Sequence, residues 1–98
     1  MASLTVLYWR DIPSQVIVKV GRRNARRELS ERFIRAIDAA AMRAGASGAD
    51  AYLANWRRAD AVECGDDLEA EAQAAAERLE AGYDNAKLAA LAANEGRA

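Results

Sequence analysis

Two segments near the start of the chain have hydrophobic patterns that predict β-strands. Residues 3–9 are largely apolar at both odd and even positions, which is typical of a strand covered on both sides, or covered on one side with aromatic residues flanking the other. Residues 15–20 carry valine at every second position, and β-branched side chains favour strands. The residues between them include Pro13, which cannot donate to a ladder, so the sequence predicts a β-hairpin whose turn spans 10–14.

Two later segments repeat apolar residues at helical spacing. The first helix is predicted to begin after Ser30, a typical N-cap residue, and to end at Gly45. A longer last helix is predicted to begin at Asp66, where Glu69 three residues later completes a capping box. Gly82 weakens the interior of this helix by roughly 1 kcal/mol relative to alanine. We therefore expect the segment beyond Gly82 to bend, fray or meet a partner.

The segment 50–58 fits two structures. Tyr52 and Trp56 stand four residues apart, as on one face of a helix, but they also alternate with Ala54, as in a strand. The segment is short for a helix and aromatic residues favour strands. We predict a strand here, followed by a short strand at 61–64.

The order of these elements, ββαβ(β)α, predicts an α+β fold in which a sheet of three or four strands carries two helices on one face. The 98 residues are expected to form a single domain, 1–98, with a core over 3–93 and a tail over 94–98. Gly21 ends the second strand, and residues 22–27 are predicted to be a basic connection to the first helix. The sheet face away from the helices is expected to present Trp9, Thr5, Ile17 and Lys19.

Composition makes the core smaller than the hydrophobic fraction implies and reveals an asymmetry of charge. Hydrophobic residues are 52% of the chain, but 25 of the 98 residues are alanine, which adds little buried area. The net charge of −1 divides into +6 over residues 1–58 and −7 over residues 59–98. Such a division permits internal neutralisation, which we favour, or a basic face for an acidic partner.

The chain lacks the residues that several common classes of functional site require. Histidine is absent, which removes the common acid–base group and His-based metal sites, and one cysteine cannot form a zinc ribbon or a CxxC redox site. Neither GxGxxG nor GxxxxGK[ST] occurs. We expect no cofactor, no metal site and no ordinary enzyme. The absence of a basic leader or a long apolar run, together with the single cysteine, predicts a cytoplasmic protein.

Polar and aromatic residues around the predicted hairpin form the candidate interaction surface. Its two Arg-Arg pairs could bind phosphates, the acidic last helix or an acidic protein. A pI of about 5.4 argues against a dedicated nucleic-acid binder, so we rank solvation or internal pairing first, an acidic protein partner second and nucleic acid third. The candidate residues are Trp9, Arg10, Asp11, Gln15, Lys19, Arg22, Arg23, Arg26, Arg27 and Trp56.

The stretch YWRDIPSQVIVKVGRR, with AIDAAAMRAG and DAYLANWRR after it, resembles the small bacterial "virulence factor" domain family over about residues 4–65. Members of this family share a YWRDIP-x-QV opening, a basic segment, an alanine-rich helix and a Trp-Arg-Arg stretch. The resemblance implies an accessory role beside folate- and corrinoid-dependent methyl-transfer enzymes of one-carbon metabolism. It supplies no catalytic residues.

Three functions follow as hypotheses. The first is a non-enzymatic protein-interaction or accessory subunit with a protein partner or a second copy of the chain. The alternatives are nucleic-acid or phosphate-ligand binding through the arginine cluster, and part of an enzyme that a partner completes.

Overall fold

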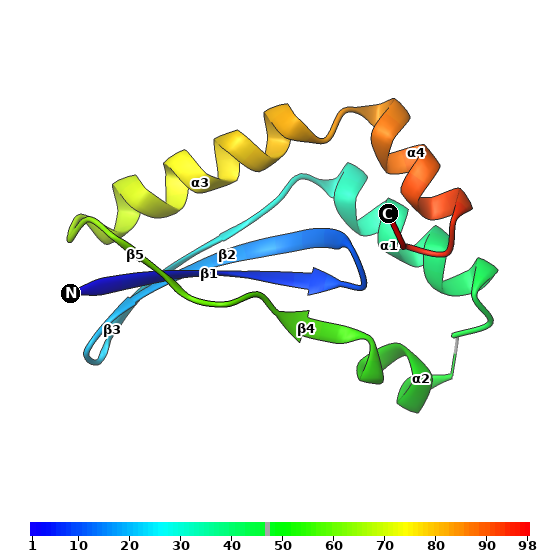
Figure 1. Ribbon diagram of the computed structural model, residues 1–98, viewed down its shortest axis with the longest axis horizontal. Coiled ribbons are helices and arrows are strands. Elements are labelled where there is room, and N and C mark those ends of the chain that lie inside the picture. The colour runs from blue at the N-terminus through cyan, green and yellow to red at the C-terminus, as the bar shows by residue number, and fades with distance from the viewer. Residues whose placement is uncertain (47) are drawn as a thin grey trace.

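The chain folds as an antiparallel sheet with a long helix lying along it and shorter helices gathered at one end (Figure 1). The computed structural model describes residues 1–46 and 48–98. Within them the elements are, in order, β1 (Ala2–Trp9), β2 (Ile12–Val20), β3 (Arg23–Glu28), α1 (Glu31–Arg43), α2 (Ala49–Ala54), β4 (Trp56–Arg58), β5 (Val62–Cys64), α3 (Leu68–Gly82) and α4 (Asn85–Ala93). The α+β class expected from the sequence is confirmed.

The sheet has the strand order β3-β2-β1-β4, and β5 also pairs with β1. β4 pairs with β1 over Leu7–Trp9 and β5 pairs over Ala2–Leu4, so the two short strands follow one another along the same edge of β1. The prediction that residues 22–27 are a connection is wrong, because 23–28 form the edge strand β3. Its charged residues suit an edge, since charges discourage pairing with another chain.

The β1–β2 turn is tighter than expected. It consists of Arg10 and Asp11, and β2 already begins at Ile12, so the predicted turn over 10–14 is wrong. The register shifts opposite Leu7 and Tyr8, within the stretch that contains Pro13. An irregularity of this kind tolerates a residue without an N–H, which explains how a proline lies inside the strand.

Two hydrophobic clusters hold the sheet and helices together. One lies between the sheet and α3, where Ala72 and Ala75 pack on Leu4, Val16 and Val18. Small side chains on α3 permit this close approach. The other lies at the turn end of the sheet and joins β1, β2, α1 and α4; its largest members are Trp9, Ile12, Phe33, Ile37, Leu88 and Leu91.

Local signals placed α1 well but failed for residues 50–58. α1 begins after Ser30, and the chain leaves it at Gly45 with a φ of +72°, a conformation that glycine favours. The predicted strand over 50–58 is wrong over its first half, which is the short helix α2, and right over Trp56–Arg58. Tyr52 lies in α2 and Trp56 begins β4, and their rings meet edge to face with centroids 5.9 Å apart.

The single last helix predicted from the sequence is two helices, because the chain bends after Gly82, which was one of the three expected alternatives. Asp84 caps α4 by accepting from the Lys87 N–H, and α4 turns to pack along α1 (Figure 1). The start of α3 lies one residue later than expected, because Asp67 accepts from the Ala70 N–H and is the N-cap. Among the described residues, no helix combines the length and apolarity needed to cross a bilayer.

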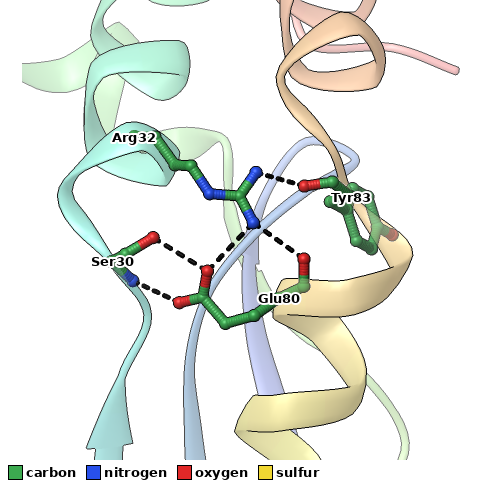
Figure 2. Close-up of polar contacts among 4 residues, drawn as sticks. All are labelled: Ser30, Arg32, Glu80 and Tyr83. Carbon is green, nitrogen blue, oxygen red and sulfur yellow. Dashed lines mark hydrogen bonds and ion pairs between the residues drawn. The ribbon is translucent and has the colours of Figure 1, made fainter.

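A carboxylate clamp fixes the end of α3 against the start of α1 (Figure 2). Glu80 accepts from the Ser30 N–H at 2.6 Å, the Ser30 hydroxyl at 2.8 Å and the Arg32 guanidinium at 3.0 Å. Arg32 also donates to the Glu80 and Tyr83 carbonyls. Partial burial acts to raise the pKa of Glu80, but the donors from Ser30 and Arg32 outweigh it and hold the pKa below its usual range.

Candidate functional site

Three segments far apart in sequence meet at the Arg10–Asp11 turn. The Arg10 N–H donates to the Asn55 carbonyl at 3.0 Å, and the Asp11 N–H donates to the Gly96 carbonyl at 2.8 Å. Arg10 has a φ of +53°, which costs a residue other than glycine roughly 1–2 kcal/mol. Contacts from both neighbouring segments therefore hold the turn in this conformation.

The Arg10 side chain is part of the support. Its Nε donates to the Asn55 Oδ1 at 3.1 Å and its Nη1 donates to the Glu95 carbonyl at 2.9 Å. Its guanidinium lies 5.1 Å from the centre of the Trp9 ring. Because the side chain is only 15% exposed, Arg10 fixes the site more than it presents charge to a ligand.

Asp11 and Arg57 form a more exposed pair beside the turn. The Arg57 Nε donates to the Arg10 carbonyl at 2.8 Å, and its Nη2 lies 3.2 Å from the Asp11 Oδ1. The other carboxylate oxygen of Asp11 accepts from the Ala98 N–H at 2.8 Å. The Arg57 side chain is 50% exposed and stacks over the Tyr8 ring at 4.6 Å, so it remains available to a partner.

Two adjoining hollows share Asp11, Arg57 and Ala98 as a common wall. One has a volume of about 350 Å³ and is lined by Tyr8, Asp11, Arg57, Ala59, Tyr83, Lys87, Leu91 and Ala98. The other has a volume of about 460 Å³ and is lined by Arg10, Asp11, Ala54, Asn55, Arg57, Arg97 and Ala98. Their lining side chains thus include four cations but a single acid, Asp11. We name these lining residues together the turn surface.

Each cation of the first hollow lies over a phenol ring. The Lys87 ammonium lies 4.3 Å from the centre of the Tyr83 ring, and the Arg57 guanidinium lies 4.6 Å from the centre of the Tyr8 ring. Burial raises the pKa of Tyr83, and the neighbouring Tyr8 and Asp11 raise it further. The Tyr83 hydroxyl therefore stays protonated near neutral pH and can donate a hydrogen bond, but it is a poor base.

A family model described as "Virulence factor" matches residues 7–92. The chain belongs to this family. The match confirms the resemblance and extends it from residues 4–65 through α3 and into α4. The family description names no reaction, ligand or partner. No curated protein and no solved structure matches the chain.

In this virulence factor family member, the candidate tryptophans lie at the turn but do not form an exposed patch. Trp9 is 0% exposed, so its placement on the interaction surface is wrong. Its Nε1 donates to the Tyr52 carbonyl at 2.9 Å, and its ring stacks on the Tyr52 ring at 5.9 Å. Trp56 is its partner in the β1–β4 register and is half-buried. Trp9 is a core residue that supports the turn from beneath.

The arginine cluster is divided by the strand that contains it. Arg23 and Arg27 pair with Val20 and Val16, on the face that carries α3, whereas Arg26 pairs with Ile17 on the opposite face. A strand alternates its side chains, so the shared side expected of a helix does not form. Arg22 lies in the β2–β3 turn, and Arg27 meets Glu69 of α3 at 3.5 Å. The four arginines are therefore not one phosphate-binding patch.

Gln15 and Lys19 lie on the sheet face opposite α3, in register with Leu7 and Ser3. Lys19 is exposed, and the Oε1 of Gln15 is buried without a hydrogen-bond partner among the described residues. Of the ten candidate residues, the structure brings Arg10 and Asp11 to the turn surface, with Trp9 and Trp56 packed beside it. The others are distributed along the sheet.

Sequence reasoning missed most of the lining of the turn surface. Tyr8 and Arg57 lie within the two stretches that carry the family resemblance, and that signal could have identified them. Tyr83, Lys87 and Arg97 have no local signal, because only the bend after α3 brings them to the turn.

The described residues show no ready metal or thiol chemistry. They contain no group of three or more acidic, cysteine or histidine side chains that could hold a metal ion. Burial raises the pKa of the Cys64 thiol, and the nearby Glu71 and Asp66 add to the shift. Cys64 is therefore a weak nucleophile near neutral pH.

Proposed function

We propose that the protein is a non-enzymatic accessory subunit that binds acidic groups of a protein partner at the turn surface. The observation that carries this proposal is the excess of cationic side chains lining two adjoining hollows, whose shared turn is fixed by hydrogen bonds from the Arg10 and Asp11 N–H groups to the Asn55 and Gly96 carbonyls. Tyrosine and arginine side chains, which line these hollows, are enriched in protein interfaces.

The state of the titratable groups supports binding over proton transfer. Both carboxylate oxygens of Asp11 accept hydrogen bonds, from Arg57 and from the Ala98 N–H. Tyr83 has a raised pKa and stays a neutral donor. A general base needs a pKa near the working pH, and the raised pKa of Tyr83 makes its hydroxyl a poor one.

The experiment needs partners of defined identity. Folate- and corrinoid-dependent methyl-transfer enzymes are the first to test, because the family resemblance associates such proteins with them. Binding of purified enzymes to the wild-type chain is measured by biolayer interferometry at about 0.15 M salt, where exposed charges are screened beyond about 8 Å.

Variants of the turn surface then locate the interface. Lys87→Glu and Arg97→Glu should each weaken binding by at least about tenfold, since reversing a contact charge costs about 1.4 kcal/mol or more. Arg22→Glu is the matched control, because it makes the same charge change in the β2–β3 turn at the other end of the sheet (Figure 1). Equal losses in all three variants would refute a turn-surface interface. A methyl-transfer rate that depends on the complex would favour the enzyme-completion alternative.

Nucleic-acid binding has weaker support. The arginines of β3 point to both faces of the sheet, and Arg27 already meets Glu69. A titration with single-stranded and duplex DNA at low salt tests this alternative directly, because phosphate contacts are strongest there.

A further inference from the structure

A groove runs between α1 and α4 on the side of α4 away from the turn surface. It has a volume of about 370 Å³. Its floor is apolar and mostly alanine; the lining residues are Arg32, Arg35, Ala36, Ala39 and Arg43 from α1, and Asn85, Leu88, Ala89, Ala92 and Ala93 from α4. Small floor residues allow another backbone to approach closely.

The composition of α4 indicates that this helix is only partly covered. In NAKLAALAA, Lys87 is the single charged residue, and a helix that is apolar all round is normally buried on every side. Here α4 buries Leu88, Leu91 and Ala92, while Ala86, Ala89, Ala90 and Ala93 are exposed. Ordinary surface helices carry charges at such positions.

The rim of the groove is positively charged. Its three arginines all come from α1, and no acidic residue among those the structure describes lines it. Arg32 is neutralised by Glu80, and Arg35 pairs with the exposed Glu31 at 3.3 Å. Asp38, which is also on α1, acts on the pKa of Tyr52 and so lies toward α2 instead.

We propose that the α1–α4 groove binds an amphipathic α-helix of another protein, with small apolar residues against the alanine floor and carboxylates facing Arg35 and Arg43. A helix laid into an apolar groove is a common mode of recognition, and the charged rim sets the sign of its polar face.

A second copy of the chain fits the groove poorly. A two-fold pairing of grooves would place the arginines of both copies face to face, which is repulsive. Docking of the acidic α3 of another copy would be a heterologous contact that builds open chains. Moreover, Glu69, Glu71 and Glu80 of α3 are already bonded within their own chain.

The test uses two synthetic amphipathic helical peptides with identical alanine–leucine faces. One has a glutamate polar face and the other has a lysine polar face. With the ¹⁵N-labelled full chain, the glutamate peptide should shift the amides of Ala36, Ala39, Ala89 and Ala93, and the lysine peptide should not. Absence of shifts at millimolar peptide, shifts located elsewhere, or equal binding of both peptides would overturn the proposal.

Variants sharpen the same test. Ala89→Glu places an acid in the groove and should weaken the glutamate peptide at least tenfold, whereas Ala86→Glu is an exposed control on the same helix outside the groove. The double variant Arg35→Glu/Arg43→Glu should instead bind the lysine peptide. Circular dichroism checks that each variant keeps its helix content.

Sedimentation equilibrium tests whether a second copy of the chain occupies the groove. A dimer of the wild-type chain that Ala89→Glu dissociates would assign the groove to a second copy and overturn our proposal. The inference does not depend on the turn surface, because Lys87→Glu and Ala89→Glu change separate faces of α4.

Discussion

Replacing Glu80 by alanine should destabilise the fold more than any other change to an acidic side chain of α3. The carboxylate accepts three side-chain or cap hydrogen bonds, two from Ser30 and one from Arg32. Ser30 begins α1 but makes no side-chain cap bond to its own helix. The Glu80 carboxylate of α3 therefore accepts the hydrogen bonds of the Ser30 N–H and hydroxyl at the start of α1, and so joins α1 to α3 (Figure 2).

The size of the effect follows from the bonds and their exposure. Three hydrogen bonds at about 1 kcal/mol each give about 3 kcal/mol, and screening of side chains that are about one-third exposed reduces this to about 2 kcal/mol. In a domain of this size the melting temperature should fall by about 10 °C. Glu77→Ala is the matched control. Glu77 lies on the same helix, is exposed and, among the described residues, accepts a hydrogen bond only from the Gln73 amide, so we expect a loss of less than about 0.5 kcal/mol.

The same clamp predicts how stability depends on pH. Because the folded pKa of Glu80 lies below its ordinary value, the unfolded chain binds the proton more readily, and stability falls as pH falls. The contribution is complete above the ordinary glutamate pKa of about 4.3 and is lost as pH drops through the folded pKa. The difference between wild type and Glu80→Ala should thus stay constant from neutral pH down to about pH 4.3 and shrink as pH falls further through the folded pKa.

Urea denaturation followed by far-UV circular dichroism measures both effects, with the free energy of unfolding extrapolated to water at each pH. The reasoning is refuted if Glu80→Ala and Glu77→Ala agree within about 0.5 kcal/mol at pH 7. A difference between wild type and Glu80→Ala that does not change with pH would show that lost packing, and not the charged acceptor, causes the destabilisation.

Three further changes have defined expectations. Gly96→Ala would place a Cβ 3.0 Å from Cζ3 of Trp9 at a φ of +84°, whereas the Cβ of Gly21→Ala would meet no atom within 4 Å at a φ of +55°. Gly96→Ala should therefore lower the free energy of unfolding by about 1–2 kcal/mol more than Gly21→Ala in urea denaturation. Equal losses would show that residues 94–98 shift to accommodate the added methyl group. Asp67→Ala removes the N-cap of α3 and should cost about 1 kcal/mol by the same assay, and a neutral result would mean that water replaces the cap. Cys64 should react with iodoacetamide more slowly than free cysteine at pH 8, as followed by mass spectrometry, because its raised pKa lowers the thiolate fraction; faster reaction would contradict the burial of the thiol.

Local patterns were sufficient for the elements whose signals lie within one segment. The valines of β2, the start signal at Ser30 and the stop signal at Gly45 each act within one segment, and they predicted α1 and residues 15–20 of β2 correctly. β3 was missed because its sequence, RNARRE, has a single buried side chain, Ala25. Its strand conformation comes from pairing with β2, which no local propensity reports.

The turn surface could be predicted only in part, because it is assembled from distant segments. The sequence predicts that Arg10 and Asp11 lie in a hairpin turn, but it predicts too long a turn and does not show which segments pack against it. The bend after Gly82 was expected from glycine in a helix, yet its direction depends on how α4 packs on α1. That packing alone decides that Lys87 and residues 94–98 reach the turn.

Three ion pairs join the basic part of the sequence to the acidic part in the folded chain. They are Arg27–Glu69, Arg32–Glu80 and Arg10–Glu95, and they are peripheral pairs worth at most about 1 kcal/mol each. Two acids of α3, Glu69 and Glu80, and Glu95 of the last residues thus lie beside arginines of the basic part of the sequence.

Among the described residues, Lys87 on one side of α4 and Arg43 at the groove on the other side form no ion pair, and this sets how a partner can engage the molecule. Lys87 faces the turn surface, and the opposite side of the helix faces the arginine rim of the α1–α4 groove. A single acidic partner that straddles α4 would contact both, and its affinity would then fall multiplicatively when Lys87→Glu and Ala89→Glu are combined. Two separate partners would each respond to one substitution alone. The arrangement of charge around α4 thus turns the two variants into a direct measure of whether the two surfaces serve one interaction or two.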